Sequence, residues 1–322
     1  MERHAAGAHR QRIHAAIATS EAARSPLVAS WKRSSELHRL DPSGRRETVY
    51  ADEGRLREAR QALEPLTRVA RPSLERLFLA VGGAGCCVIL ADRHGVAVER
   101  LGSGGDDRHF RDLGLWTGAI WSETEQGTNG IGTCLVERRA VTIHRDQHFF
   151  TGNAALSCTA VPLHDHEGRF VAVLDISSCR NDLTEALVQV IALAVAESAR
   201  RIEIDLFRRA FPDARVMLAP TADGNPAALV AVDGHDLVIG ASRAARKALD
   251  IGGGPIAGRL SARDLFGGAD RGPESLVAAE RSVYRRALAR HAGNVTAAAR
   301  ELGVSRATLH RKLNQLRLRA ND

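Results

Sequence analysis

The stretch of residues 293–313, GNVTAAARELGVSRATLHRKL, carries the start and stop signals of two short helices. Asn294 and Ser305 are residue types that cap helix N-termini, and Gly303 suits the left-handed backbone that ends a helix. The second helix has one apolar face, made by Leu309, Leu313 and Leu316. Small alanines in the first helix let the two helices cross closely. The stretch therefore predicts a helix-turn-helix whose second helix fits the major groove of DNA.

The opposite face of that second helix is polar and basic, with Arg306, Thr308, His310, Arg311 and Lys312. A surface hairpin with a solvated basic face is the alternative, and the charge distribution argues against it. The chain has a net charge of +7, while residues 271–322 hold eleven Arg or Lys and four acids. The remaining residues therefore sum to zero, and a basic module on a neutral body is typical of phosphate-backbone binding.

Composition bounds the rest of the chain. Its 322 residues suggest about two domains, and 44% hydrophobic residues suffice for ordinary cores. No apolar run approaches the roughly 18 residues of a membrane span, and the N-terminal MERHAAGAHR lacks the apolar core of a signal peptide. The five cysteines form no C-x-x-C pair, which favours a reduced, cytoplasmic chain.

The first half of the chain predicts helices followed by strands. Residues 1–50 form a polar leader with a helix at 27–37, and a longer helix at 52–81 is expected to be broken or kinked by Pro65 and Pro72. Five stretches then have strand patterns: 86–92, 96–102, 140–144, 157–163 and 169–177.

A long helix follows at 183–209, capped by Asn181 or Asp182. Helix, five strands and helix predict an α+β fold in which helices flank one antiparallel sheet. Residues 227–242 then predict a β-hairpin with an Asp-Gly turn and a capped helix after it. Glycine-rich stretches at 252–255 and 267–272 are typical of linkers.

The segment GTNGIGT (127–133) invites comparison with nucleotide-binding loops. It lacks the strand-loop-helix context of a dinucleotide fold, and we expect either a turn that needs glycine or a loop that lines a pocket. A P-loop is absent from the sequence, because none of Lys32, Lys247 and Lys312 follows a glycine.

Aromatic and polar residues around this segment are candidates for binding a small molecule, although each also has a structural explanation. Tryptophans can be core residues, histidines can be surface or hydrogen-bonded residues, and Cys158 can be a buried apolar thiol or a redox sensor. The candidate effector-binding residues are Trp116, Trp121, Asn129, Thr133, His144, His148, Phe149 and Cys158.

The sequence predicts no catalytic or metal site. His144 and His148 share a helical face only if that segment is helical, and we expect a strand end there. Zinc needs about four convergent ligands, so a histidine-based metal site is the weaker alternative. No serine, histidine and acid, or pair of glutamates, stands at catalytic spacing, and no cofactor is expected.

Five stretches of the sequence resemble parts of known families. GNVTAAARELGVSRATLHRKL resembles the Fis-type helix-turn-helix that ends many bacterial enhancer-binding activators. WSETEQGTNGIGTCL and SCTAVPLHDHEGRFVAVLDIS are similar to the GAF sensor of the acetoin-catabolism regulator group, and SPLVASWKRS resembles its leader. ALVAVDGHDLVIGASRAARKAL is similar to a degenerate PAS-like segment of that group. The group's AAA+ ATPase has no counterpart between these blocks.

The resemblance implies four parts: a helical leader (1–50), a GAF-like sensor (51–209), a degenerate PAS-like segment with linker (210–270) and a Fis-type helix-turn-helix (271–322). By position in the family motif, Ser305 and Arg306 should reach base edges, with Arg306 suited to guanine. The other implied DNA-binding residues are Asn294, Thr296, Thr308, His310, Arg311 and Lys312.

The expected function is a sequence-specific transcriptional regulator that senses a small molecule and acts without hydrolysing ATP. Its expected partners are a near-palindromic operator in double-stranded DNA, the effector, a second copy of the chain and RNA polymerase, with no membrane. A dimer would read half-sites about one helical turn apart. Two alternatives remain: an architectural DNA-binding protein that senses nothing, and an enzyme using the thiol of Cys134 or Cys158.

Overall fold

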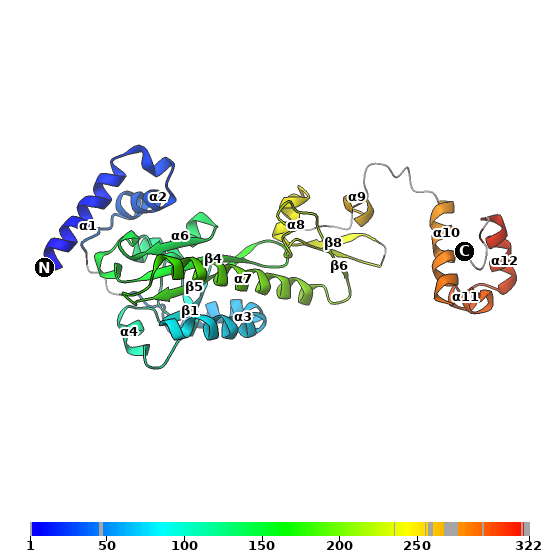
Figure 1. Ribbon diagram of the computed structural model, residues 1–322, viewed down its shortest axis with the longest axis horizontal. Helices are drawn as coiled ribbons and strands as arrows, with labels where there is room; N and C mark the ends of the chain where they lie inside the picture. The colour runs from blue at the N-terminus through cyan, green and yellow to red at the C-terminus, as the bar shows by residue number, and fades with distance from the viewer. Residues whose placement is uncertain are drawn as a thin grey trace. The chain divides into compact units, whose positions relative to one another are not determined.

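The computed structural model describes residues 2–44, 48–234, 236–254, 256, 260–266, 276–291, 293–316 and 318. It divides into two compact units, Met1–Leu265 and Phe266–Asp322 (Figure 1). The α+β class is confirmed, with two antiparallel sheets in the first unit and helices in the second. Among the residues described, no helix is both long enough and apolar enough to cross a membrane. The predicted linker at 267–272 lies outside the described residues.

The larger sheet has five antiparallel strands in the order β2-β1-β5-β4-β3. Each of the five expected strands exists, and its ends fall within one residue of the expected ones. The strands are β1 (Cys86–Asp92), β2 (Ala97–Leu101), β3 (Val141–His144), β4 (Ser157–His164) and β5 (Phe170–Ser178). We call residues 53–210, which contain this sheet, the central domain.

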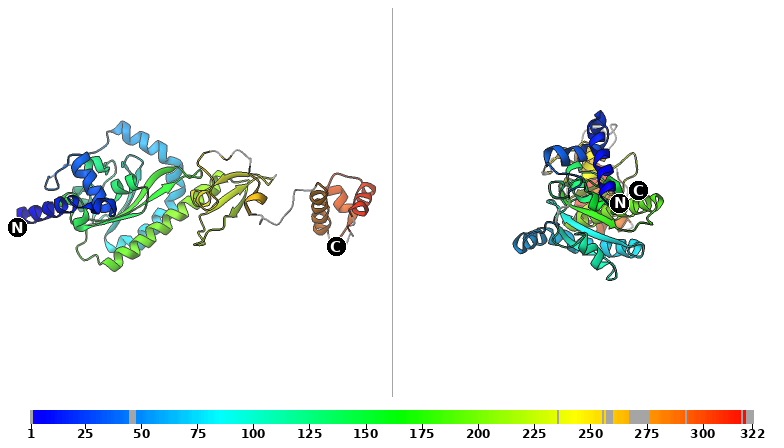
Figure 2. Two further views of the ribbon diagram at one scale, coloured as in Figure 1. Left: turned by 90° about the horizontal axis from the view of Figure 1, so that it is seen from above. Right: turned by 90° about the vertical axis from the view of Figure 1, so that its left-hand side faces the viewer.

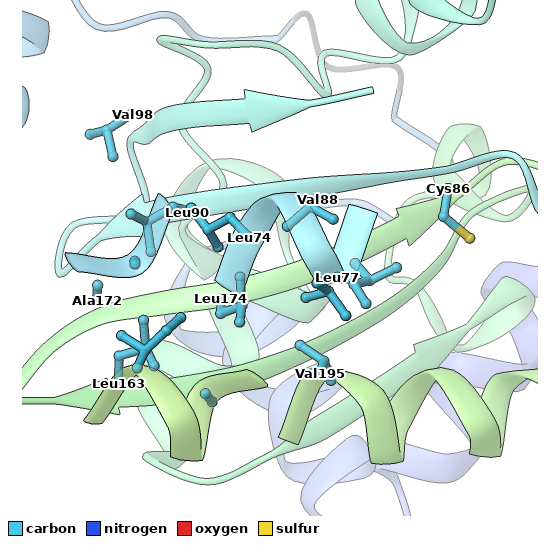
Figure 3. Close-up of a cluster of buried hydrophobic side chains, with 14 of the residues drawn as sticks. Leu74, Leu77, Cys86, Val88, Leu90, Val98, Leu163, Ala172, Leu174 and Val195 are labelled. Carbon is cyan, nitrogen blue, oxygen red and sulfur yellow. The ribbon is translucent and has the colours of Figure 1, made fainter. Parts of the chain in front are cut away.

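Two long helices, α3 (Glu53–Val81) and α7 (Glu185–Ala210), cover one face of the sheet (Figures 2 and 3). The expected break in the first of them is wrong, because α3 runs without interruption through Pro65 and Pro72. Each proline removes one backbone hydrogen bond. A continuous row of buried leucines and valines on the sheet side of α3 offsets that loss.

The core between these helices and the sheet is apolar throughout. It includes Leu74, Leu77, Val88, Leu90, Leu163, Leu174 and Val195 (Figure 3). The expected cap of α7 is wrong by a few residues. Thr184, rather than Asn181 or Asp182, accepts a hydrogen bond from the Leu187 amide and begins the helix.

Short helices and turns cover the opposite face. They are α4 (Asp107–Asp112), α5 (Glu123–Gln126), α6 (Gly130–Glu137), η4 (Arg145–Gln147) and η5 (Thr151–Asn153), while η3 (Gly82–Ala84) continues from α3 on the first face. A second apolar cluster lies under them, around Phe110, Leu115, Trp121, Ile131 and Leu156. The sheet is therefore sandwiched between two different layers.

The leader packs on this second layer. It consists of α1 (Glu2–Ile17), η1 (Ser20–Ala23), α2 (Pro26–Lys32) and η2 (Arg33–Leu37). The helix expected at 27–37 is therefore present as α2 and η2, and α1 is a second helix within the leader that was expected to be helical. Trp31 and Ile13 bury themselves against Phe149 and Phe150 of the central domain.

A smaller sheet follows α7. Its strands are β6 (Arg215–Leu218), β7 (Leu229–Val232) and β8 (Val238–Ala241), in sequential order, with α8 (Arg243–Ala248) and α9 (Ala262–Phe266) after them. The hairpin expected at 227–242 is β7 and β8, while β6 was missed. Phe207 near the end of α7 is buried with Leu229 and Ala231, so the helix enters the core of the smaller sheet (Figure 2).

From residue 276 on, the part of the second unit that the structure describes is a module of three helices. It contains α10 (Leu276–Arg290), α11 (Val295–Glu301) and α12 (Arg306–Gln315). Ala298 and Ala299 are buried between the helices, as the sequence predicts, and Leu309 and Leu313 close the core from α12.

Candidate functional site

The two helices of the hairpin begin at the expected caps. The Asn294 side chain accepts hydrogen bonds from the Thr296 and Ala297 amides, each at 3.1 Å. The Ser305 hydroxyl accepts one from the Thr308 amide at 3.0 Å. Gly303 has a φ of 65°, the left-handed conformation that glycine adopts readily. These contacts fix the direction in which α12 leaves the turn.

The outer face of α12 is basic and open to solvent. Arg306, His310 and Arg311 are exposed, while Leu309 and Leu313 face the core. The exposed face lies on a helix of ten residues that begins with Arg306. It has the composition of a phosphate- and base-contacting surface.

The other predicted DNA-binding residues differ in their exposure and in the contacts that they form. Lys312 is half-buried and forms an ion pair of 2.6 Å with Glu280 of α10. This contact raises the pKa of Lys312 and lowers that of Glu280. The Thr308 hydroxyl lies 2.8 Å from the Ser305 hydroxyl. The Lys312 ammonium group is therefore paired with a carboxylate of the same unit, whereas the Thr296 side chain is exposed to solvent.

The segment GTNGIGT is neither a turn nor a loop along its whole length. Gly130 begins α6, and the Asn129 side chain caps it by accepting from the Gly132 amide at 2.8 Å. The glycines are required by contact. A Cβ on Gly130 would lie 2.7 Å from the Cβ of Cys158, and one on Gly127 would lie 2.7 Å from the Phe149 side chain. The expectation of a turn that needs glycine holds at the start of the segment, where Gly127 has a φ of 59°, whereas residues 130–133 belong to α6 and not to a loop.

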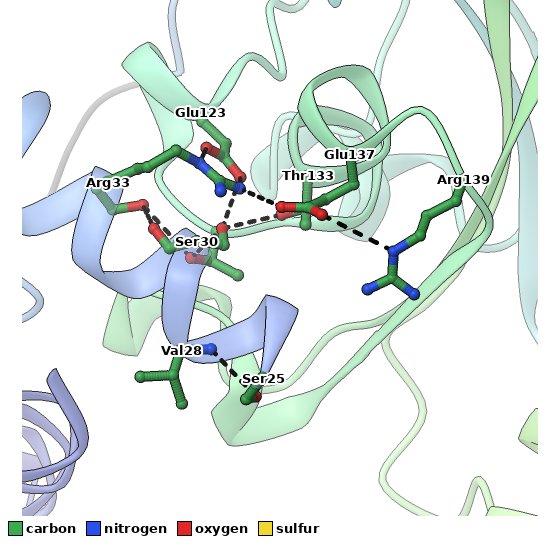
Figure 4. Close-up of polar contacts among 10 residues, drawn as sticks. Ser25, Val28, Ser30, Arg33, Glu123, Thr133, Glu137 and Arg139 are labelled. Carbon is green, nitrogen blue, oxygen red and sulfur yellow. Dashed lines mark hydrogen bonds and ion pairs between the residues drawn. The ribbon is translucent and has the colours of Figure 1, made fainter. Parts of the chain in front are cut away.

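The leader uses the polar side chains of this segment (Figure 4). The Ser30 hydroxyl donates to Glu123 at 2.6 Å and lies 2.7 Å from Thr128 and 3.2 Å from Thr133. All four of these residues are buried. The predicted effector residue Thr133 is thus in contact with the leader.

A bidentate ion pair holds the leader beside this contact. The Nε and Nη2 atoms of Arg33 donate to the two carboxylate oxygens of Glu123 at 2.8 and 2.9 Å. Glu137 lies 2.9 Å from the same guanidinium (Figure 4). These contacts, chiefly the hydrogen bond to Glu123, raise the pKa of Arg33. Trp31 adds a hydrogen bond of 2.8 Å to the Gln147 carbonyl.

Three other predicted effector-binding residues belong to the interior, and His144 is partly buried. Trp121 donates to the Gly114 carbonyl at 2.9 Å and is buried with Asn129 and Phe149. His144, at the end of β3 as expected, pairs with the Ser157 hydroxyl at 2.9 Å. Burial lowers the pKa of His144.

His148 and Cys158 lie at one end of a buried polar chain. His148 Nδ1 lies 2.9 Å from the Arg145 carbonyl, so Nδ1 carries the proton and Nε2 accepts from the Cys158 thiol at 3.4 Å. Ser177 lies 3.0 Å from that sulfur and 2.6 Å from Asp175. With Asp175 protonated, its carboxyl group donates to the Ser177 hydroxyl, which in turn donates to the Cys158 sulfur. The Cys158 thiol then donates to Nε2 of His148.

The pKa directions agree with a neutral chain. Burial raises the pKa of Asp175 to about 7, although the Ser177 hydrogen bond opposes it. Burial lowers the pKa of His148 to about 4. Burial and the nearby Asp175 raise the pKa of Cys158 well above its usual range, and the same two causes raise that of Cys134. Neither thiol is therefore poised as a nucleophile.

Trp116 is the one predicted effector residue that is partly exposed and stacked among charges. Its ring lies 4.4 Å from the Arg100 guanidinium carbon and 4.2 Å from that of Arg111. Sequence reasoning missed Arg100. The sequence signal for Arg100 is a charged residue within a strand, at the position that pairs with the apolar Ile89.

The large cleft of the structure lies away from the predicted effector-binding residues. A cleft of about 1080 Å³ runs along α3 and the β4–β5 turn, and none of the eight predicted effector residues lines it. Within the described part of the chain, no three His, Cys, Asp or Glu side chains converge as metal ligands would.

Comparison with protein families identifies both modules. Residues 65–199 match the GAF domain, and residues 275–316 match the family described as "Bacterial regulatory protein, Fis family". Residues 200–274 lie between the two matches.

Two curated relatives are transcriptional regulators. The chain is 35% identical over 240 residues to the acetoin catabolism regulatory protein of Cupriavidus necator, across 73% of this chain and 36% of that protein. It is 32% identical over 132 residues to the acetoin dehydrogenase operon transcriptional activator AcoR of Bacillus subtilis, across 41% of this chain and 22% of that one. The chain thus spans about a third or less of the length of these relatives.

Among solved structures, the Escherichia coli DhaR(N)–DhaL complex contains a similar fold. The TM-score is 0.51 with 17% identity, and the match covers 74% of this chain and 82% of that one. At this identity the likeness concerns the fold alone. Together, the matches show a GAF domain joined in one chain to a Fis-family helix-turn-helix, related to the acetoin-type transcriptional regulators.

Proposed function

We propose that this chain is a DNA-binding transcriptional regulator whose GAF domain responds to a small molecule. The observation that carries the proposal is the outer face of α12, where Arg306, His310 and Arg311 project from a helix packed on its other side. Such a helix can enter a major groove while its apolar side stays buried. The match to the Fis family and the two regulator relatives support the same function.

Regulation without ATP hydrolysis is part of the proposal. The sequence contains no P-loop, and residues 200–274 hold a small sheet and helices between the two matched modules. We infer that the chain acts by occupying its operator or by contacting RNA polymerase. An enzymatic role for the thiols finds no support in their burial and raised pKa values.

A dimer is proposed because one hairpin reads few base pairs. Two copies would place two α12 helices about one helical turn, roughly 34 Å, apart on DNA. Exposed apolar side chains on the outer side of α7, Val190 and Leu193, suit a contact between copies.

Selection of random duplex DNA by the full-length chain tests the proposal. Enrichment of a palindromic sequence whose half-sites lie one helical turn apart would support a specific dimeric regulator. Binding without an enriched sequence, which fades steadily as salt rises, would contradict it and favour an architectural protein.

The substitution Arg306→Ala tests the assigned face on the selected operator. We expect a loss of about 1–3 kcal/mol in binding and relaxed preference at one base position. Arg285→Ala, which removes one exposed charge from α10, is the matched control and should leave base preference unchanged. Equal effects of the two variants on base preference would show that α12 is not the reading helix.

A further inference from the structure

Arg100 has a buried side chain, and of its three guanidinium nitrogens only Nη1 has a hydrogen-bond partner among the described residues. It lies on β2, the edge strand of the large sheet, on the face that carries α4 to α6. Its side chain is 7% exposed, and Nη1 donates to Asp107 at 2.8 Å. Among the described residues, its Nε and Nη2 atoms have no hydrogen-bond partner, and both are shut off from solvent.

The two unpartnered atoms form one edge of the guanidinium. Nε–H and Nη2–H point the same way and match the two oxygens of a carboxylate. The same chain uses this edge twice in that manner. Arg33 binds Glu123 through it at 2.8 and 2.9 Å, and Arg180 binds Asp182 at 2.8 and 2.6 Å.

The surroundings of Arg100 form a small cationic and aromatic cage. The Trp116 ring stacks between Arg100 and Arg111, and Phe110 lies 5.2 Å from Arg100. Asp107 pairs with Nη1 of Arg100 and leaves the Nε–Nη2 edge without an anionic partner among the described residues. Gly102 adds no side chain, because a Cβ there would overlap the guanidinium.

We propose that the Nε–Nη2 edge of Arg100 binds the carboxylate of a small organic acid, with Trp116 as the wall of the site. The inference rests on the proposed function, since it names the chemical class of the GAF effector. Trp116 and Arg111 are the more exposed layer. The acid enters as they move aside, and binding thereby couples to α4.

The first test measures the thermal stability of the full-length chain with acetate, pyruvate and benzoate as probes. Acetamide and benzamide, which share shape but not charge, are the neutral controls. We expect at least one acid to raise the Tm and its amide to leave it unchanged. Equal shifts with acid and amide, or no shift with any acid at high millimolar concentration, would overturn the proposal. A response to inorganic phosphate alone would also overturn it.

Variants locate the effect. Arg100→Lys keeps the charge and loses the two-pronged edge, while Gly102→Ala displaces the guanidinium and keeps its charge. Both should weaken acid binding by about tenfold or more, because a bidentate pair is lost. Arg108→Ala, on the exposed side of α4, should bind as the unaltered chain does. An unaltered response in Arg100→Lys would contradict the assignment.

A spectroscopic readout on the unaltered chain guards against misfolded variants. The Arg100 Nε–H resonance, identified by its loss in Arg100→Lys, should move on adding acid and stay in place on adding amide. Neither readout contains DNA. Failure here would leave the DNA-binding proposal intact, and failure of operator selection would leave the acid site intact.

Discussion

Leu174 and Asp175 are neighbours in the central strand of the large sheet, and they face opposite layers. Leu174 meets the apolar core under α3 and α7. Asp175 meets Ser177, Gly130 and the buried chain that leads to His148. Both are fully buried.

The difference shows that the two faces of the sheet have different roles in the domain. Burying apolar area stabilises the fold, whereas burying a carboxyl group costs free energy unless it is neutral or well paired. Asp175 Oδ1 and Gln126 Nε2 have no partner within the described chain, and Arg100 lies on the same face. The α3–α7 face therefore supplies stability, and the opposite face keeps polar groups that a purely structural core would lack.

The substitution Leu174→Ala should weaken the packing between the sheet and the helices α3 and α7, and its effect on stability should be the largest. We expect the free energy of unfolding to fall by up to about 5 kcal/mol, because a central leucine leaves a cavity between two helices and a sheet. Chemical denaturation measures it. Leu79→Ala, at an exposed position of α3, is the control and should change little. Comparable losses would show that this face is not the main source of stability.

Asp175→Asn should change how stability depends on pH. The pKa of Asp175 is raised from 3.8 to about 7, so its favourable contribution is complete below pH 4 and is lost as pH rises through 7. The loss is at most about 4 kcal/mol. The asparagine variant should lack this decline and gain stability relative to the unaltered chain at pH 8.

Denaturation at several pH values measures that difference. The buried His148, whose pKa is lowered to about 4, acts in the opposite direction below pH 6.5. The comparison between Asp175→Asn and the unaltered chain removes its contribution. Parallel pH profiles would mean that Asp175 is ionised in the folded chain and that the polar chain is charged.

Glu123→Ala tests how firmly the leader closes the polar face. It leaves the Arg33 guanidinium and the Ser30 hydroxyl without their shared partner, at a cost of about 3 kcal/mol. Faster proteolysis between α2 and α3 should report release of the leader. Glu36→Ala, which removes an exposed ion pair with Lys32, is the control. Unchanged proteolysis would show that apolar contacts of Trp31 hold the leader alone.

Ser25→Ala should have the smallest effect. Ser25 caps α2 by accepting from the Val28 amide at 3.4 Å (Figure 4). Loss of a cap costs about 1 kcal/mol, which should loosen the leader less than Glu123→Ala does. Proteolysis of the two variants under the same conditions ranks them, and the reverse order would place the main tether in the helix itself.

The sequence predicts the elements whose signals are local. Period-two strands and the caps at Asn294 and Ser305 appear where expected. α3 passes through Pro65 and Pro72 because tertiary burial outweighs a local penalty.

The candidate site was less predictable because its contacts join distant segments. GTNGIGT forms a helix start since Gly130 and Gly132 must approach β4 and Trp121, which no local pattern reveals. The pairing of Lys312 with Glu280 depends on how α10 packs. Arg100 stands out in the sequence as a charged residue in a strand, but its contact with Trp116 depends on the fold.

The length of α7 has a mechanical consequence. Its 26 residues span about 39 Å, with Val195 packed on the large sheet and Phe207 inside the smaller one. A tilt of about 5° at one end displaces the other by about 3 Å over that length. Between Val195 and Phe207, which are about 18 Å apart along the helix, the same tilt moves the end that enters the smaller sheet by about 1.5 Å, roughly half the width of a water molecule.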